Sequence, residues 1–210
     1  MKFTKGYWMN LPGVTNTDAV QVREVKVEND RVYLYTVPYH ADMRAMGGPL
    51  LEMYISSPQP DIIRTEAYHF MGSNQKMPAF ELNDAHCALE VENTETTVTI
   101  KSGNTKLVIG KNPCSFDYYY KDKKLTSIGN RFGNAMISTI STPDGNYMRA
   151  QMNLDIGEKV YGLGERFTPY VKNGQTVETW NEDGGTCTEI SYKSIPFYIT
   201  RSEERRVGKE

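Results

Sequence analysis

The chain has 210 residues, of which 39% are apolar and 24% charged, so it is long enough for one domain with a real core. Its net charge of −2 leaves no basic surface, which argues against nucleic acid or an anionic membrane as a partner. Three distant cysteines without a CxxC pair argue against a disulfide framework or a zinc site. No secretory signal and no apolar stretch of ~18 residues is present, so we expect a cytoplasmic protein with reduced thiols.

The first predicted element is a β-hairpin. Val20, Val22, Val25 and Val27 form an extended segment with an irregularity between the two pairs, and a turn at residues 29–30 leads into a return strand at 32–37. Further strands are predicted at residues 51–55, 62–70, 86–91, 96–101, 107–109, 115–120, 125–128 and 147–154.

The spacing of these elements indicates the fold class. Short strands follow one another with turn signals about every 8–12 residues, and no segment shows the helical period of about 3.6 residues. Parallel α/β architecture is disfavoured because the long helices needed for crossovers are missing from the pattern. The sequence therefore predicts an all-β, antiparallel sandwich or barrel.

The last ten residues differ from what precedes them. Residues 195–200 predict a buried strand, whereas residues 201–210 carry charge at seven of ten positions. This decapeptide resembles a translated sequencing-adapter read-through, so we expect an artefactual tail rather than a solvated native one. The expected domain is then residues 1–200, incomplete at its C-terminus.

Residues 160–200 carry the most specific pattern. Gly162 and Gly164 indicate a sharp bend or a close approach of another backbone, and a third glycine with a following helix, as in a dinucleotide fingerprint, is missing. The adjacent Glu165 and Arg166 predict a partly buried structural ion pair. The polar loop at 170–195 is long enough to suggest a functional role.

Three residues of this loop have the chemistry of sugar recognition. An indole ring stacks on the apolar face of a pyranose while amide and carboxylate groups bond its hydroxyls, which makes Trp180, Asn181 and Asp183 the candidate substrate-binding residues. Alternatives stay open, because Asp183 before Gly-Gly also suits a turn and Trp180 also suits a packing anchor.

The block resembles the segment that closes the N-terminal domain of glycoside hydrolase family 31. The motifs Y-G-L-G-E-R-F, N-G-Q-T-V-E-T-W-N, D-G-G-T and I-P-F-Y occur here in the order found in its α-xylosidase branch. Trp8 and the Pro12-Gly13 pair near the start also match. The resemblance covers residues 1–200 and implies a galactose-mutarotase-like β-sandwich.

The resemblance also implies a function. Family members are retaining α-glycosidases that need no cofactor, and both catalytic aspartates lie on a (β/α)8 barrel that follows the sandwich. We therefore expect no catalytic residue and no metal site here, and an inactive fragment of an enzyme that removes terminal α-linked xylose, or glucose, from oligosaccharides. In the family the 170–195 loop reaches over the barrel mouth, where an aspartate matching Asp183 contacts the sugar. The implied partners are the oligosaccharide, the barrel of the same parent chain and further copies in a homo-oligomer.

Two other functions remain open at this stage. A free-standing carbohydrate-binding sandwich would bind sugar saturably, and a mutarotase-like enzyme would interconvert sugar anomers. The histidines do not favour the second, because His40 lies in a loop and His69 and His86 lie in or beside strands, where a histidine is more often a packed or surface residue than a general base.

Overall fold

The computed structural model describes residues 3–5, 9–38, 50–69, 86–129, 137–182 and 188–202. These residues form sixteen β-strands and no helix, so the predicted all-β class is confirmed. The described part thus contains no helix of the length and apolarity needed to cross a membrane. The chain divides into two compact units, a sandwich unit at residues 10–153 and a loop unit made of residues 1–9 and 154–210.

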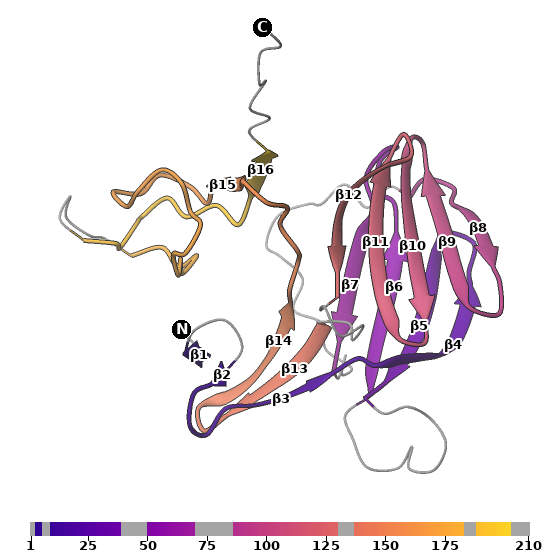
Figure 1. Cartoon of the computed structure of the whole chain (residues 1–210), viewed down its shortest axis with the longest axis horizontal. Helices are drawn as coiled ribbons and strands as arrows, with labels where there is room; N and C mark the ends of the chain where they lie inside the picture. Colours follow the sequence, from indigo (N-terminus) through magenta and orange to yellow (C-terminus); the bar gives the residue numbers. More distant parts are fainter. Residues whose placement is uncertain are drawn as a thin grey trace, which may run out of the picture. The chain divides into compact units, whose positions relative to one another are not determined.

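Two sheets of the sandwich unit face each other across the core (Figure 1). One sheet has the order β4-β5-β6-β7, with strands Gln21–Val27, Arg31–Val37, Leu51–Ser56 and Arg64–Tyr68. The other has the order β12-β11-β10-β9-β8, with strands Lys123–Ile128, Cys114–Tyr120, Thr105–Lys111, Thr97–Ser102 and Glu90–Asn93. Neighbouring strands in both sheets are antiparallel, so each layer is built largely from consecutive hairpins.

Three smaller groups of strands complete the fold. A three-stranded sheet with the order β14-β13-β3 belongs to the sandwich unit and contains Gly145–Ala150, Ile137–Thr142 and Thr15–Asp18. The pair β15-β16, Glu158–Gly162 and Tyr198–Ser202, belongs to the loop unit. The short strands β1 and β2, Thr4–Lys5 and Met9–Asn10, also pair with each other.

The core follows from the alternation along the strands. Strand β5 buries Val32 and Leu34, and strand β10 buries Leu107 and Ile109, while the residues between them face outward. Side chains from both sheets therefore meet in one layer. The thiol of Cys114 lies in this core with its pKa raised to about 12 by burial, consistent with a small apolar role.

Most predicted strands are confirmed, with shifted ends. The irregularity predicted in the first hairpin is a β-bulge between Val22 and Glu24. The turn between the strands predicted at 115–120 and 125–128 is shorter than the four residues that separate them, because Lys121 and Asp122 both adopt positive φ angles and strand β12 already begins at Lys123.

Other boundaries were wrong. The strand predicted at 62–70 is described only over Arg64–Tyr68, and Phe70 lies outside the described residues. The strand predicted at 86–91 forms at Glu90–Asn93 instead, since before it a single backbone bond from Cys87 to Ser57 replaces a ladder. The strand predicted at 195–200 begins only at Tyr198, because Pro196 has no N–H for a ladder. The prediction that it is buried was also wrong, since Tyr198 and Ile199 are exposed. It continues through Arg201 and Ser202, beyond which no residue is described.

The outward face of the four-stranded sheet carries a pH-sensitive tyrosine. The hydroxyl of Tyr33 donates a hydrogen bond to Glu52 at 3.0 Å, and burial, followed by this bond, raises the Tyr33 pKa from 10.0 to about 12. The unfolded chain ionises this group near pH 10, where the folded chain still holds the proton. The contribution of Tyr33 to stability is therefore complete below pH 10 and is lost between pH 10 and 12.

We expect Tyr33→Phe to make the fall in unfolding free energy across pH 10 to 12 less steep than in the unsubstituted chain. Urea denaturation at intervals of half a pH unit measures this slope. Part of the fall remains in the variant, because Cys114 and Tyr68 also have raised pKa values. Parallel curves for the two proteins would contradict the expectation.

Candidate functional site

The candidate site lies in the connection between β15 and β16, residues 163–197. The two strands pair in register from Gly162 with Tyr198 to Glu158 with Ser202, and Leu163 N–H adds a bond to the Phe197 carbonyl at 2.8 Å. The ends of the connection are thus held together. Among its described residues, the one bridge between extended segments joins Asn181 and Ser191.

Two glycines allow the ends to approach so closely. Gly162 and Gly164 have φ angles of +109° and +88°, which side chains rarely permit. A Cβ atom on Gly162 would lie 2.7 Å from the Phe197 carbonyl oxygen, and one on Gly164 would overlap the Lys193 carbonyl oxygen. The predicted close backbone approach is confirmed at both positions.

The predicted ion pair between Glu165 and Arg166 is wrong. Glu165 pairs with Lys193 at 2.6 Å on the exposed surface, and this bond raises the pKa of Lys193. Arg166 instead donates to the carbonyl oxygens of Leu163, Glu178 and Glu189 and to the hydroxyl of Ser194. The two adjacent charges therefore bond to different partners.

A buried lysine is a feature that the sequence did not reveal. Lys172 is 8% exposed, and its ammonium donates to the Thr168 hydroxyl at 3.0 Å and the Pro169 carbonyl at 2.8 Å. Burial, and then the charge of Arg166, lower its pKa. Its backbone N–H also bonds to Val160 of β15, so Lys172 anchors the first part of the connection to the strand.

The candidate residues Trp180 and Asn181 lie side by side, and Asp183 lies outside the described residues. The Trp180 side chain is exposed, at 72%. Asn181 Oδ1 accepts a hydrogen bond from the backbone N–H of Ser194 at 2.8 Å, and the Ser194 hydroxyl donates to the Trp180 carbonyl at 3.2 Å. The Trp180 ring is thus available for stacking, while the Asn181 oxygen serves the loop itself.

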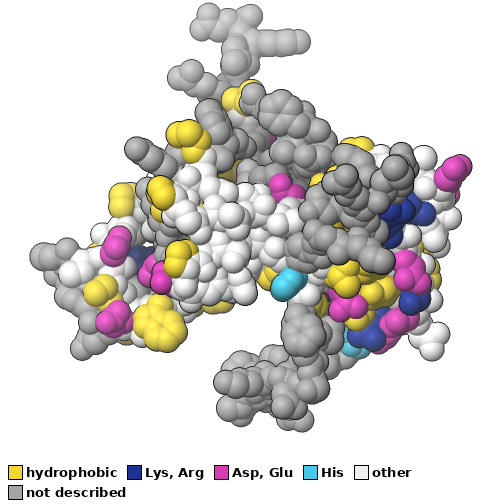
Figure 2. Space-filling model, turned by 90° about the horizontal axis from the view of Figure 1, so that it is seen from below, with side chains coloured by type: hydrophobic (Ala, Val, Ile, Leu, Met, Phe, Trp, Pro, Cys, Tyr) yellow, Lys and Arg dark blue, Asp and Glu magenta, His cyan; other side chains and the backbone are white. Residues whose placement is uncertain are grey.

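A pocket of about 210 Å³ opens beside Trp180. Three glutamates, two threonines and Arg166 are among the residues that line it, and the full lining is Arg166, Thr168, Thr176, Val177, Glu178, Trp180, Glu182, Glu189, Ile190 and Ser191. Figure 2 shows hydrophobic and acidic side chains interleaved over the surface of the loop unit. An aromatic ring among carboxylate and hydroxyl acceptors suits a polyhydroxylated ligand.

The three glutamates were missed because each stands alone in a polar sequence. The sequence does not indicate that Glu178, Glu182 and Glu189 lie around one pocket. Their segments are brought together by the Asn181–Ser191 bridge, and no residue pattern predicts this bridge. A second hollow of about 500 Å³ in the same unit includes Lys172, Tyr170 and Tyr192.

Residues 52–208 match the glycosyl hydrolase 31 N-terminal galactose mutarotase-like domain. The chain belongs to this family. The resemblance to family 31 that the sequence motifs indicate is thereby confirmed. Two relatives that align with 95% of this chain support the α-xylosidase branch. The α-xylosidase XylQ of Lactiplantibacillus pentosus is 33% identical over 207 residues, and an α-xylosidase of Emericella nidulans is 34% identical over 221.

The family 31 domain also has solved structural neighbours. A cycloalternan-forming enzyme from Listeria monocytogenes, solved with a pentasaccharide substrate, superposes with a TM-score of 0.68 over 91% of this chain and 17% of its own length, at 20% identity. This likeness supports the β-sandwich fold. The chain spans about a quarter of its two α-xylosidase relatives, 26% and 28% of their lengths.

Outside the connection, the described titratable residues do not converge on another site. His69 directly follows strand β7 and is exposed, while His86 lies 3.9 Å from Asp30 and His40 lies outside the described residues. Within the described ranges, no three His, Cys, Asp or Glu side chains are grouped to hold a metal ion.

Proposed function

We propose that this family 31 domain is the N-terminal part of a longer retaining α-glycosidase that hydrolyses terminal α-linked xylose from oligosaccharides. The domain supports a catalytic (β/α)8 barrel of the same parent chain, and its β15–β16 connection contributes to the substrate site. The observation that carries the proposal is the exposed Trp180 beside a small acidic pocket. The α-xylosidase relatives, about four times as long, support it.

The loop unit has the surface expected for contact with a further domain. Large apolar side chains are exposed there to an extent that a solvated loop does not need, namely Ile156, Phe167, Tyr170, Trp180, Tyr192, Ile195, Phe197, Tyr198 and Ile199. Exposed aromatic and aliphatic side chains at this density typically mark an interface. We assign the barrel of the parent chain as the partner that covers part of them.

The division of labour follows from the chemistry. A retaining glycosidase needs two carboxyl groups about 5–5.5 Å apart, which family members supply from the barrel. The role left to this domain is substrate binding. In this role Trp180 stacks on a sugar ring, and the Asp183 carboxylate accepts a hydrogen bond from a sugar hydroxyl. Asn181 supports the same segment through Ser194. The parent enzyme is placed in the cytoplasm and in a homo-oligomer as part of this proposal.

The test uses the complete reading frame of which this chain is a part. The enzyme it encodes should hydrolyse an aryl α-xyloside, whereas this chain alone should not. In that enzyme we expect Asp183→Asn to lower kcat/KM about 10- to 150-fold, because a hydrogen bond to a charged group contributes about 1.5–3 kcal/mol. Asp144→Asn in the exposed β13–β14 turn is the control and should leave kcat/KM unchanged.

Three outcomes would count against the proposal. A native frame that ends with this domain would remove the parent enzyme. Saturable binding of methyl α-D-xyloside by the isolated chain would favour a free-standing carbohydrate-binding module. Acceleration of sugar mutarotation, followed by polarimetry, would favour a mutarotase-like enzyme.

A further inference from the structure

The loop unit is held together by polar contacts. Among its described residues no apolar side chain is fully buried, and the two buried residues are Lys172 and Ser191, both polar. The sandwich unit, by contrast, buries aliphatic and aromatic side chains from two sheets. The position of any residue in the β15–β16 connection therefore depends on hydrogen bonds rather than on a hydrophobic core.

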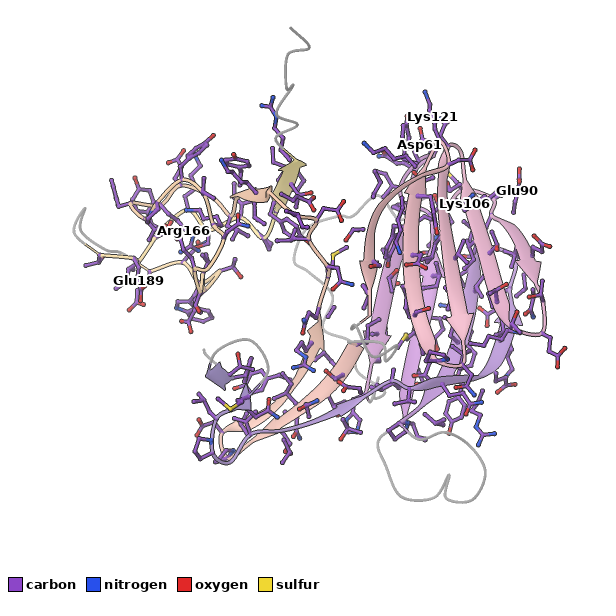
Figure 3. The ribbon with its side chains drawn as sticks, viewed as in Figure 1. Asp61, Glu90, Lys106, Lys121, Arg166 and Glu189 are labelled. Carbon is purple, nitrogen blue, oxygen red and sulfur yellow. The ribbon has the colours of Figure 1, made fainter. Side chains whose placement is uncertain are left out.

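The Arg166 side chain donates four of these bonds. Figure 3 shows its side chain in the interior of the connection. Nε donates to the Leu163 carbonyl at 3.0 Å, Nη1 to the Glu189 carbonyl at 3.4 Å, and Nη2 to both the Glu178 carbonyl and the Ser194 hydroxyl, the latter at 2.8 Å. Because the guanidinium is planar and rigid, it fixes four chain segments relative to one another.

Two of these four segments lead directly to the candidate sugar platform. Glu178 precedes Trp180 by two residues, so Arg166 holds the backbone on one side of the Trp180–Asn181 pair. Ser194, which accepts from Arg166, donates its hydroxyl to the Trp180 carbonyl and its N–H to Asn181 Oδ1. The pair is therefore held on one side by Arg166 itself and on the other by Ser194.

We propose that Arg166 is a positioning residue, which fixes the Trp180–Asn181 pair in place for sugar binding through Glu178 and Ser194. This inference rests on the proposed function. It goes further by assigning part of the substrate affinity of the site to the hydrogen bonds that Arg166 makes within the connection. Lysine cannot replace it, since one ammonium lacks the fork that reaches carbonyls on several segments at once.

The first test measures amide hydrogen exchange in the chain itself. The reporters are Glu182 N–H, which bonds to the Ser191 carbonyl at 3.0 Å, and Ser194 N–H. We expect Arg166→Lys to accelerate exchange at both by at least tenfold. Lys193→Met is the matched control, because it removes an exposed ion pair from the same unit, and it should leave both rates unchanged.

Two further sets of amides distinguish a local loss of positioning at the Trp180–Asn181 pair from general unfolding of the chain. Amides of β9–β11 report the sandwich unit, and Leu163 N–H reports the β15–β16 pair. Both sets should keep their protection in Arg166→Lys. Unchanged exchange at Glu182 and Ser194, or loss of protection at Leu163 as well, would overturn the inference.

The second test uses the enzyme encoded by the complete reading frame. Arg166→Lys should raise KM about tenfold and leave kcat within twofold, because a misplaced platform weakens binding without touching the reacting atoms. Trp180→Ala is the reference. If it leaves KM unchanged, the proposed platform fails whatever Arg166→Lys does. If it raises KM and Arg166→Lys does not, the positioning role alone is overturned.

Discussion

Phe116→Ala is expected to lower the free energy of unfolding of the sandwich unit by about 3–5 kcal/mol. Phe116 is fully buried in β11, with Ile109 of β10 and Ile128 of β12 as its cross-strand neighbours. Removing the ring takes away its transfer free energy and leaves a cavity between the two sheets. Both effects act in the same direction.

Urea denaturation followed by far-ultraviolet circular dichroism measures this loss. Tyr119→Ala is the matched control, because Tyr119 lies in the same strand on the outward face, where Lys106 Nζ lies 5.0 Å from the ring centroid. We expect this control to cost about 1 kcal/mol or less. Equal losses for the two variants would show that the core does not lie where the alternation of β11 places it.

Gly164→Ala is expected to open the base of the β15–β16 connection. The added Cβ would overlap the Lys193 carbonyl oxygen and lie 2.8 Å from the backbone nitrogen of Ile195 and 3.0 Å from the Ser194 Cα, all backbone atoms that cannot rotate away. The positive φ angle costs roughly 1–2 kcal/mol for alanine, and the overlap costs roughly 1–3 kcal/mol more. The same carbonyl accepts the Glu165 N–H, so this bond should be lost.

Exchange of the Glu165 amide measures the opening, with the sandwich amides as an internal reference. Gly174→Ala separates the two costs, because Gly174 has a similar φ angle of +76° in the same unit but no atom near an added Cβ. This control should cost roughly 1–2 kcal/mol and leave the Glu165 amide protected. Similar exchange in both variants would mean that the close approach at Gly164 is not essential.

The fold class could be predicted from the sequence because alternation and turn residues are local signals. The bulge at Val22 was visible as a break between two valine pairs, and most hairpins followed their turns. Strand β13 was missed, since Ser138 is buried between Ile137 and Thr139 and interrupts the expected alternation.

The candidate site was predictable only in part. The indole of Trp180 could be assigned to an exposed segment from its polar surroundings, and this is where it lies. The partners of Arg166 could not be predicted, because three of the four are backbone carbonyls whose residue types carry no signal. Burial of Lys172 was equally invisible, since it depends on how the chain folds back on itself rather than on its neighbours in sequence.

The passage from β3 to β4 has a mechanical consequence. Ala19 N–H bonds to Ile137 of β13, Val20 N–H bonds to Val37 of β5, and the Val20 carbonyl accepts from Cys114 of β11. Two successive residues thus join all three sheets of the sandwich unit. Separating any one sheet from the others would break at least one of these hydrogen bonds. We therefore expect the three sheets to unfold in a single cooperative transition without a detectably populated intermediate.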